Sequence, residues 1–148
     1  MKKVHILLVE DNEGDIVLTL EAFKDAKINN TISIVRDGEE AILFLEKQDK
    51  YANVLRPDII LLDINLPRLN GKDTLYFIKN AEEFKSIPVI MLTSSSQTED
   101  VQDAYESKAN MYLVKPTDFA HYEDVVNAIQ NLWLSMSKTY TNDLNNAC

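Results

Sequence analysis

The sequence predicts an α/β domain built on an open, doubly wound parallel sheet with helices on both faces. Short runs rich in Val, Ile and Leu alternate with longer segments of helical periodicity, which is the pattern of buried strands beneath covering helices. With 148 residues, 45% of them hydrophobic, the chain is long enough for one well-filled core and too short for two ordinary domains. We therefore expect five strand–helix units in a single domain.

Five apolar runs are the predicted strands. They cover residues 4–9, 31–36, 58–62, 88–92 and 110–114. The second run is more mixed in polarity than the others, which favours a position at the edge of the sheet. Gly38, Pro57, Gly71 and Pro88 lie in the connections, where such residues turn the chain.

Apolar residues between these runs recur at the spacing of helices that cover a sheet. The first two helices are predicted over residues 13–26 and 39–47. The buried faces of the later helices are indicated by Leu75, Phe77 and Ile78 for the third, by Val101 and Tyr105 for the fourth, and by Val125, Val126, Ile129, Leu132, Trp133 and Met136 for the fifth. The fifth stripe is the widest.

Beyond about Ser135 the chain becomes rich in Ser, Thr, Asn and Asp. This composition favours a frayed end over a second domain. The expected organisation is a domain over residues 1–135 and a polar C-terminal tail over 136–148.

The net charge of −9 argues against binding to nucleic acids or anionic membranes, because like charges repel. No apolar stretch approaches the ~20 residues that a membrane-spanning helix needs. The single cysteine, Cys148, permits no intrachain disulfide. We therefore expect a cytoplasmic protein without a membrane segment.

Polar side chains close four of the five predicted strands. They are Glu10 and Asp11 after the first, Asp63 after the third, Thr93 after the fourth and Lys115 after the fifth. The carboxyl ends of parallel strands share one edge of the sheet, where the loops form a crevice. These side chains are therefore expected to meet.

The carboxylates at this edge predict a metal site. Glu10, Asp11 and Asp63 would repel one another unless a cation lay among them. An all-oxygen site with few protein ligands suits Mg²⁺, which keeps several of its water molecules. The backbone carbonyl of Asn65 is a candidate for a further ligand.

Each of these residues also has a simpler interpretation. Glu10 and Asp11 could be solvated acids ahead of a helix, whose dipole favours negative charge there. Asp63 could merely open a turn, and Thr93 could belong to a helix cap. Lys115 could be an ordinary surface lysine. It is their joint occurrence at the strand ends that favours a functional site.

Several motifs resemble those of receiver domains of two-component response regulators, over about residues 4–133. They are LLVEDN, RDGEEAILFL, DIILLDINLPRLNG, VIMLTSSS and MYLVKP. In such receivers, Pro and Gly follow the acceptor aspartate at four and eight residues, and here these residues are Asp63, Pro67 and Gly71. The resemblance implies the flavodoxin-like receiver fold with strand order 2-1-3-4-5.

The resemblance also implies roles for individual residues. It makes Asp63 the phosphoacceptor, assigns Glu10 and Asp11 to Mg²⁺, places Thr93 and Lys115 on the phosphoryl oxygens, and makes Tyr112 the switching aromatic. Glu10 departs from the commonest receiver pattern, in which Asp is usual. Its longer side chain leaves open whether it binds the metal directly or through water. Tyr112 could equally be a half-buried strand residue.

The segments EDNEGD, YANVLRPDIILLDINLP and LWLSMSK are similar to those of the small regulators that serve cyanobacterial and bacterial phytochromes. This similarity implies a phytochrome-type histidine kinase as the partner. Such regulators self-associate, and Trp133, Leu134 and Met136 widen the last apolar stripe beyond what one covering face needs. We therefore expect a homodimer.

The predicted function is that of a signalling phosphoacceptor. Asp63 takes a phosphoryl group from a histidine kinase with Mg²⁺, and any enzymatic activity is limited to self-phosphorylation and loss of its own phosphate. Two alternatives remain open. One is a degenerate receiver that acts only as a dimeric scaffold. The other is an aspartyl-phosphate phosphatase, although Asn65 stands where that class has a second acid.

Overall fold

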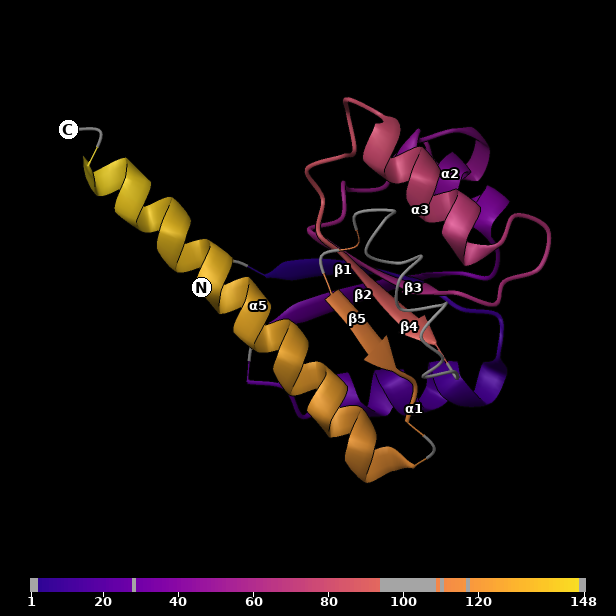
Figure 1. The fold of residues 1–148 in the computed structure, drawn as a ribbon, viewed down its shortest axis with the longest axis horizontal. Helices are drawn as coiled ribbons and strands as arrows, with labels where there is room; N and C mark the ends of the chain where they lie inside the picture. The colour runs from indigo at the N-terminus through magenta and orange to yellow at the C-terminus, as the bar shows by residue number, and fades with distance from the viewer. Residues whose placement is uncertain (1–2, 28, 94–108, 110, 117, 147–148) are drawn as a thin grey trace.

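The chain folds into a parallel sheet that is covered by helices on both faces (Figure 1). The computed structural model describes residues 3–27, 29–93, 109, 111–116 and 118–146. The strands are β1 (Val4–Val9), β2 (Asn30–Val35), β3 (Ile59–Asp63), β4 (Val89–Thr93) and β5 (Met111–Val114). The helices are α1 (Glu13–Lys24), α2 (Gly38–Leu45), α3 (Gly71–Asn80) and α5 (Phe119–Asn146), and a short 3₁₀ helix covers Asp49–Tyr51.

The five strands lie in the order β2-β1-β3-β4-β5, and every neighbouring pair is parallel. The predicted fold class and strand order are therefore confirmed. In the ladder, Asp63 lies opposite Leu92, and Thr93 lies opposite Val114. Asp63 and Thr93 are the last residues of β3 and β4, so both polar side chains lie at the same carboxyl edge of the sheet.

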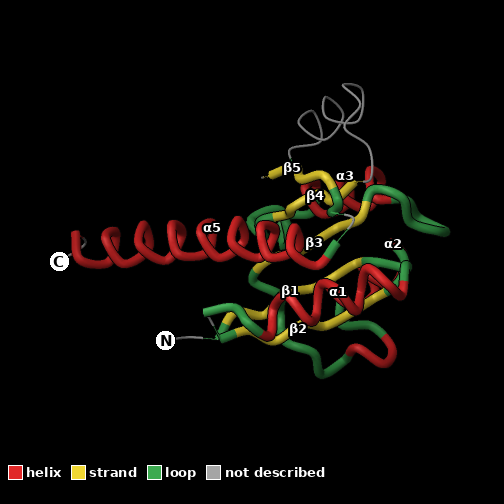
Figure 2. Tube along the Cα trace, turned by 90° about the horizontal axis from the view of Figure 1, so that it is seen from below, coloured by secondary structure: helices red, strands yellow, loops and turns green. Residues whose placement is uncertain are grey.

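Each face of the sheet carries its own hydrophobic layer. Helices α2 and α3 cover one face, whereas α1 and α5 cover the other, as both views show (Figures 1 and 2). Alternation along β1 divides its side chains: Leu7 and Val9 join the α2/α3 layer, while Ile6 and Leu8 join the α1/α5 layer. Strands buried on both faces explain why the sequence shows continuous apolar runs.

The observed strands agree with the predicted runs to within one residue at each end. Strand β2 is only partly buried, as expected for an edge strand. The first two helices end two residues earlier than predicted. For α2 the reason is local, because Lys47 adopts a φ of 55°, in the left-handed region that stops a helix. The predicted fourth helix, with Val101 and Tyr105, lies outside the described residues.

The C-terminal segment differs from the prediction of a frayed tail. Helix α5 continues through Asn146 and extends past the sheet (Figures 1 and 2). The segment contains neither Gly nor Pro, so polar composition alone does not end the helix. The division between a domain at 1–135 and a tail at 136–148 stays a prediction. In the part of the chain that the structure describes, no helix has both the length and the apolar character needed to cross a membrane.

Three helices begin with a side-chain cap directly after the loops that surround the site. Asn12, Asp37 and Asn70 precede α1, α2 and α3, and the side chain of each accepts a hydrogen bond from the backbone N–H three residues on, at 2.8–2.9 Å. Such caps satisfy donors that the first turn leaves unpaired. They fix where each helix leaves the carboxyl edge of the sheet.

Candidate functional site

Three carboxylates converge at the carboxyl edge of the sheet. Glu10 and Asp11 follow β1, Asp63 closes β3, and one oxygen of each side chain lies within 4.8 Å of the others. Glu10 and Asp63 are buried, whereas Asp11 is exposed. The parallel pairing of β1 with β3 brings these residues together although they are distant in sequence.

The ammonium group of Lys115 lies against the same cluster. Lys115 follows β5, and its backbone N–H donates a hydrogen bond to the carbonyl of Thr93 at 2.5 Å. The ammonium Nζ is 3.1 Å from Asp63 Oδ2 and 2.9 Å from Asp15 Oδ2, and it also pairs with Glu10 Oε1. One cation therefore contacts three carboxylates. Its burial favours the neutral amine, but the hydrogen bonds to Glu10 and Asp15 outweigh this and raise the Lys115 pKa.

Glu10 is a site residue whose charge is only partly compensated. Its side chain is 2% exposed, and its Oε2 has no hydrogen-bond partner among the described residues. Burial, followed by hydrogen bonding to Asp63, raises the pKa of Glu10 to about 8, although Lys115 acts in the opposite direction. Since a buried carboxylate oxygen without a hydrogen-bond partner is costly, Oε2 of Glu10 favours either a proton or a further cation.

Asp15 is a site residue that the sequence did not single out. It lies in the first turn of α1, where its Oδ1 accepts a hydrogen bond from the Tyr122 hydroxyl at 2.8 Å. Burial opposes ionisation, but the hydrogen bonds from Lys115 and Tyr122 prevail and lower the pKa of Asp15. The only sequence signal was an acid four residues after Asp11 within EDNEGD. No sequence motif indicated that Asp15 lies beside Lys115, which follows β5, and Tyr122 of α5.

The loop after β3 packs closely on the backbone of Asp63. The backbone N–H of Asn65 donates to Asp63 Oδ1 at 3.1 Å, and that of Gly71 donates to the carbonyl of Ile64 at 3.1 Å. A Cβ atom on Gly71 would lie 2.3 Å from the carbonyl oxygen of Asp63. The glycine eight residues after the aspartate is thus required by space, because α3 begins directly against the end of β3.

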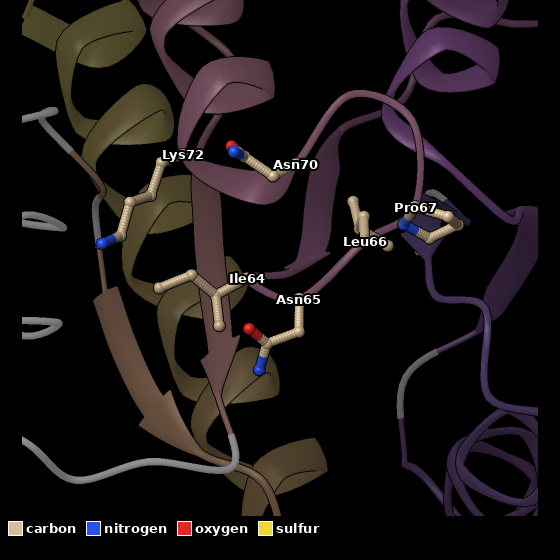
Figure 3. Close-up of a pocket in the computed structure, with 6 residues that line it drawn as sticks. All are labelled: Ile64, Asn65, Leu66, Pro67, Asn70 and Lys72. Carbon is tan, nitrogen blue, oxygen red and sulfur yellow. The ribbon is translucent and has the colours of Figure 1, made fainter.

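A pocket opens next to this strand end, between β3 and the start of α3 (Figure 3). Its lining residues are Ile64, Asn65, Leu66, Pro67, Asn70 and Lys72. Asn65 and Pro67 come from the loop and Lys72 from the first turn of α3. The pocket therefore exposes the segment that carries the candidate carbonyl ligand, and the ligand role of Asn65 stays a prediction.

Thr93 and Tyr112 lie on the adjacent strands β4 and β5. Thr93 is fully buried at the end of β4. Tyr112 is half-buried opposite Met91, and its ring packs against the α2/α3 layer. These positions are compatible with the predicted roles as phosphoryl ligand and switching aromatic, and both roles stay predictions.

The donor set fits a divalent cation of the hard, oxygen-preferring kind. All the candidate side-chain ligands are carboxylates, and they approach one another closely. The unpartnered Oε2 of Glu10 is a buried oxygen that lacks a donor within the described chain. A cation at this position would reduce the repulsion among the carboxylates and would give Oε2 of Glu10 a positively charged partner.

Comparison with known proteins identifies relatives along most of the chain. Residues 6–127 match the response regulator receiver domain family. The response regulator Rcp1 of Synechocystis sp. is 41% identical over 129 residues, which cover 87% of this chain and 88% of Rcp1.

Two solved structures share the fold. The phosphorylated cyanobacterial phytochrome response regulator RcpA has a TM-score of 0.84 and 38% identity, with 91% of this chain and 96% of that chain covered. The Mn²⁺-bound form of Rcp1 has a TM-score of 0.81 and 40% identity, with 88% of this chain and 94% of that chain covered. The chain therefore belongs to the response regulator receiver domain family, whose members are signalling proteins.

Proposed function

We propose that this protein is a response regulator in which Asp63 accepts the phosphoryl group. The arrangement around Asp63 carries the proposal. Its buried carboxylate ends a central strand, lies 3.1 Å from the Lys115 ammonium and is grouped with the carboxylates of Glu10 and Asp11. Membership of the receiver family and the similarity to phosphorylated RcpA support the same conclusion.

Phosphoryl transfer asks the protein mainly for positioning and charge neutralisation. An oxygen of Asp63 forms the new bond to phosphorus, while the bond to the donor's histidine nitrogen breaks and its electron pair stays on that nitrogen. Negative charge is spread over the equatorial oxygens in this step. Lys115 provides a fixed positive charge beside them, and Thr93 donates its hydroxyl to one oxygen.

Glu10, Asp11 and Asp63 would hold a divalent cation, and Mg²⁺ is the expected ion. The backbone carbonyl of Asn65 is the proposed further ligand. When bound, the cation offsets repulsion between the carboxylates and the incoming phosphoryl group. The unpartnered buried oxygen of Glu10 supports this assignment, and the relative Rcp1 has been crystallised with Mn²⁺.

The proposed output is a change at the surface formed by β4 and β5. Movement of Thr93 towards the phosphoryl group vacates space, and Tyr112 on the neighbouring strand fills it. The new charge on Asp63 thus shifts an equilibrium between two arrangements of this surface.

The proposed partner is a histidine kinase of the phytochrome type. This rests on the similarity to Rcp1 and RcpA, the latter described as a cyanobacterial phytochrome response regulator. A homodimer in the cytoplasm is proposed as the working form. Trp133 and Leu134 pack partly on the α1/α5 layer, which accounts for some of their apolar surface within one chain. The remaining, half-exposed part supports an interface.

Phosphorylation of the purified protein by acetyl phosphate and Mg²⁺ tests the proposal, with the intact mass as the readout. The wild type should gain one phosphoryl group, and Asp63→Asn should gain none because the amide cannot accept it. Asp58→Asn is a matched control, since Asp58 lies at the other end of β3, where it accepts the His5 backbone N–H at 2.8 Å. The control should label like the wild type.

The same reaction separates the alternative functions. No adduct at saturating donor would favour a dimeric scaffold and refute the proposal. Release of many phosphates per chain from phosphomonoesters would favour a phosphatase. An adduct that persists in Asp63→Asn would show that another residue is the acceptor.

A further inference from the structure

Asp15 links the Lys115 ammonium to helix α5. The carboxylate of Asp15 accepts at both oxygens, from Lys115 Nζ at 2.9 Å on Oδ2 and from the Tyr122 hydroxyl at 2.8 Å on Oδ1. Tyr122 is 1% exposed and belongs to the α1/α5 layer, so its hydroxyl is fixed by packing. The backbone carbonyl of Asp15 also accepts from the Thr19 hydroxyl at 2.7 Å. The contacts with Lys115 and Tyr122 orient the Asp15 carboxylate.

Among the three carboxylates that contact Lys115, Asp15 is the one that does not belong to the proposed cation site. Glu10 and Asp63 belong to the cluster proposed to hold the divalent cation. A cation held by Glu10 and Asp63 would reduce the negative charge that these two groups offer to Lys115. Asp15 then remains as the partner that keeps the ammonium at the edge of the site.

We propose that Asp15, oriented by Tyr122, is a positioning residue that holds Lys115 where its ammonium faces the phosphoryl group on Asp63. The inference rests on the proposed function of Asp63 and adds to it a second layer of residues from α1 and α5. A flexible lysine that is held in place loses less entropy when it contacts the transition state. The rate of phosphoryl transfer should therefore depend on residues that never touch the phosphoryl group.

Measured rates of Asp63 phosphorylation by acetyl phosphate at fixed Mg²⁺ test this role. Asp15→Asn removes the ion pair and should slow the reaction about five- to tenfold. Tyr122→Phe removes only the hydroxyl that orients Asp15 and should slow it about two- to threefold, without any change in net charge. Tyr122→Phe also keeps the buried ring, so it provides a readout if Asp15→Asn folds poorly.

Glu13→Gln is the matched control. Glu13 is a second acid in the first turn of α1, but it pairs with Arg36 at 2.7 Å on the exposed surface. The variant makes the same change in charge and in helix-dipole interaction as Asp15→Asn. It should react within about 1.5-fold of the wild type, because it leaves the Lys115 contacts intact.

A Lys115→Met background separates positioning from a general effect. If Asp15 acts through Lys115, Asp15→Asn should cause no further slowing once Lys115 is absent. If the two effects multiply instead, or if Asp15→Asn and Tyr122→Phe react as fast as the wild type, the inference is wrong. A wild type that forms no adduct at all would instead refute the proposed function, so the two failures can be told apart.

Discussion

Gly71 lies where no side chain fits. Its backbone N–H bonds to the carbonyl of Ile64, and an added Cβ would lie 2.3 Å from the carbonyl oxygen of Asp63 and 2.6 Å from the Cα of Ile64. Its φ is not in the left-handed region, so the requirement is one of space rather than of backbone freedom. A single missing side chain thus allows α3 to begin against Asp63, the proposed phosphoacceptor.

Replacement of Gly71 by Ala should therefore destabilise the protein by about 1–3 kcal/mol, because backbone atoms must move to admit the new methyl group. Urea denaturation monitored by circular dichroism measures this change. Gly14→Ala is the control, since its Cβ would meet only the Asn12 side chain, at 3.3 Å. Equal stability of Gly71→Ala and the wild type would contradict the close packing described here.

Among the secondary-structure elements, α5 begins with an exposed ion pair beside the site. Asp118 accepts the backbone N–H of His121 at 3.0 Å, and its carboxylate lies 2.6 Å from His121 Nδ1. The side-chain hydrogen bond to Asp118, aided by its charge, raises the pKa of His121. The backbone N–H of His121, followed by its ring, lowers the pKa of Asp118. The first turn of this helix therefore responds to pH.

His121 should titrate above its ordinary value of 6.5, and Asp118→Asn should lower its pKa towards that value. Because folding raises the pKa of His121, protonation of this ring stabilises the folded state. The stabilisation from a protonated His121 is fully present below pH 6.5 and is lost as the pH rises through the folded-state pKa. NMR titration of the His121 ring protons in the wild type and in Asp118→Asn measures the difference. An unchanged pKa in Asp118→Asn would show that the pair does not form in solution.

Across the molecule as a whole, the fold concentrates negative charge at one edge of the sheet. The chain carries a net charge of −9, and the carboxylates of Glu10, Asp11 and Asp63 converge there next to Lys115. Folding therefore has to overcome repulsion that the unfolded chain avoids. A ligand that binds only the folded arrangement should raise the stability of the entire domain.

Mg²⁺ should stabilise the protein by about 1.4 kcal/mol at a free concentration about ten times its dissociation constant. For a domain of this size the expected rise in Tm is ~3–6 °C. Differential scanning calorimetry with Mg²⁺, and again after EDTA, measures the shift. In Asp11→Asn the shift should shrink at the same Mg²⁺ concentration. Equal stability of the wild type with Mg²⁺ and with EDTA would count against the cation site.

The fold class, the strands and most of the candidate site could be predicted from the order of residues. Buried parallel strands leave continuous apolar runs, and the rule that carboxyl ends share one edge is enough to group Asp63, Thr93 and Lys115. The end of α2 was harder to place, because the left-handed backbone at Lys47 has no marker such as Gly in the sequence. The helical continuation of α5 was missed because composition is a weak guide to helix ends.

Only the packing of the folded chain showed which groups surround Lys115. It also showed that Oε2 of Glu10 has no hydrogen-bond partner among the described residues. Asp15 and Tyr122 meet because α1 packs on α5, although they are 107 positions apart in the chain. The raised pKa of Glu10 depends on its burial and on Asp63 at the end of β3, while Lys115 after β5 acts in the opposite direction. Periodicity records which face of an element is buried, but it carries no information on which distant side chains share that space.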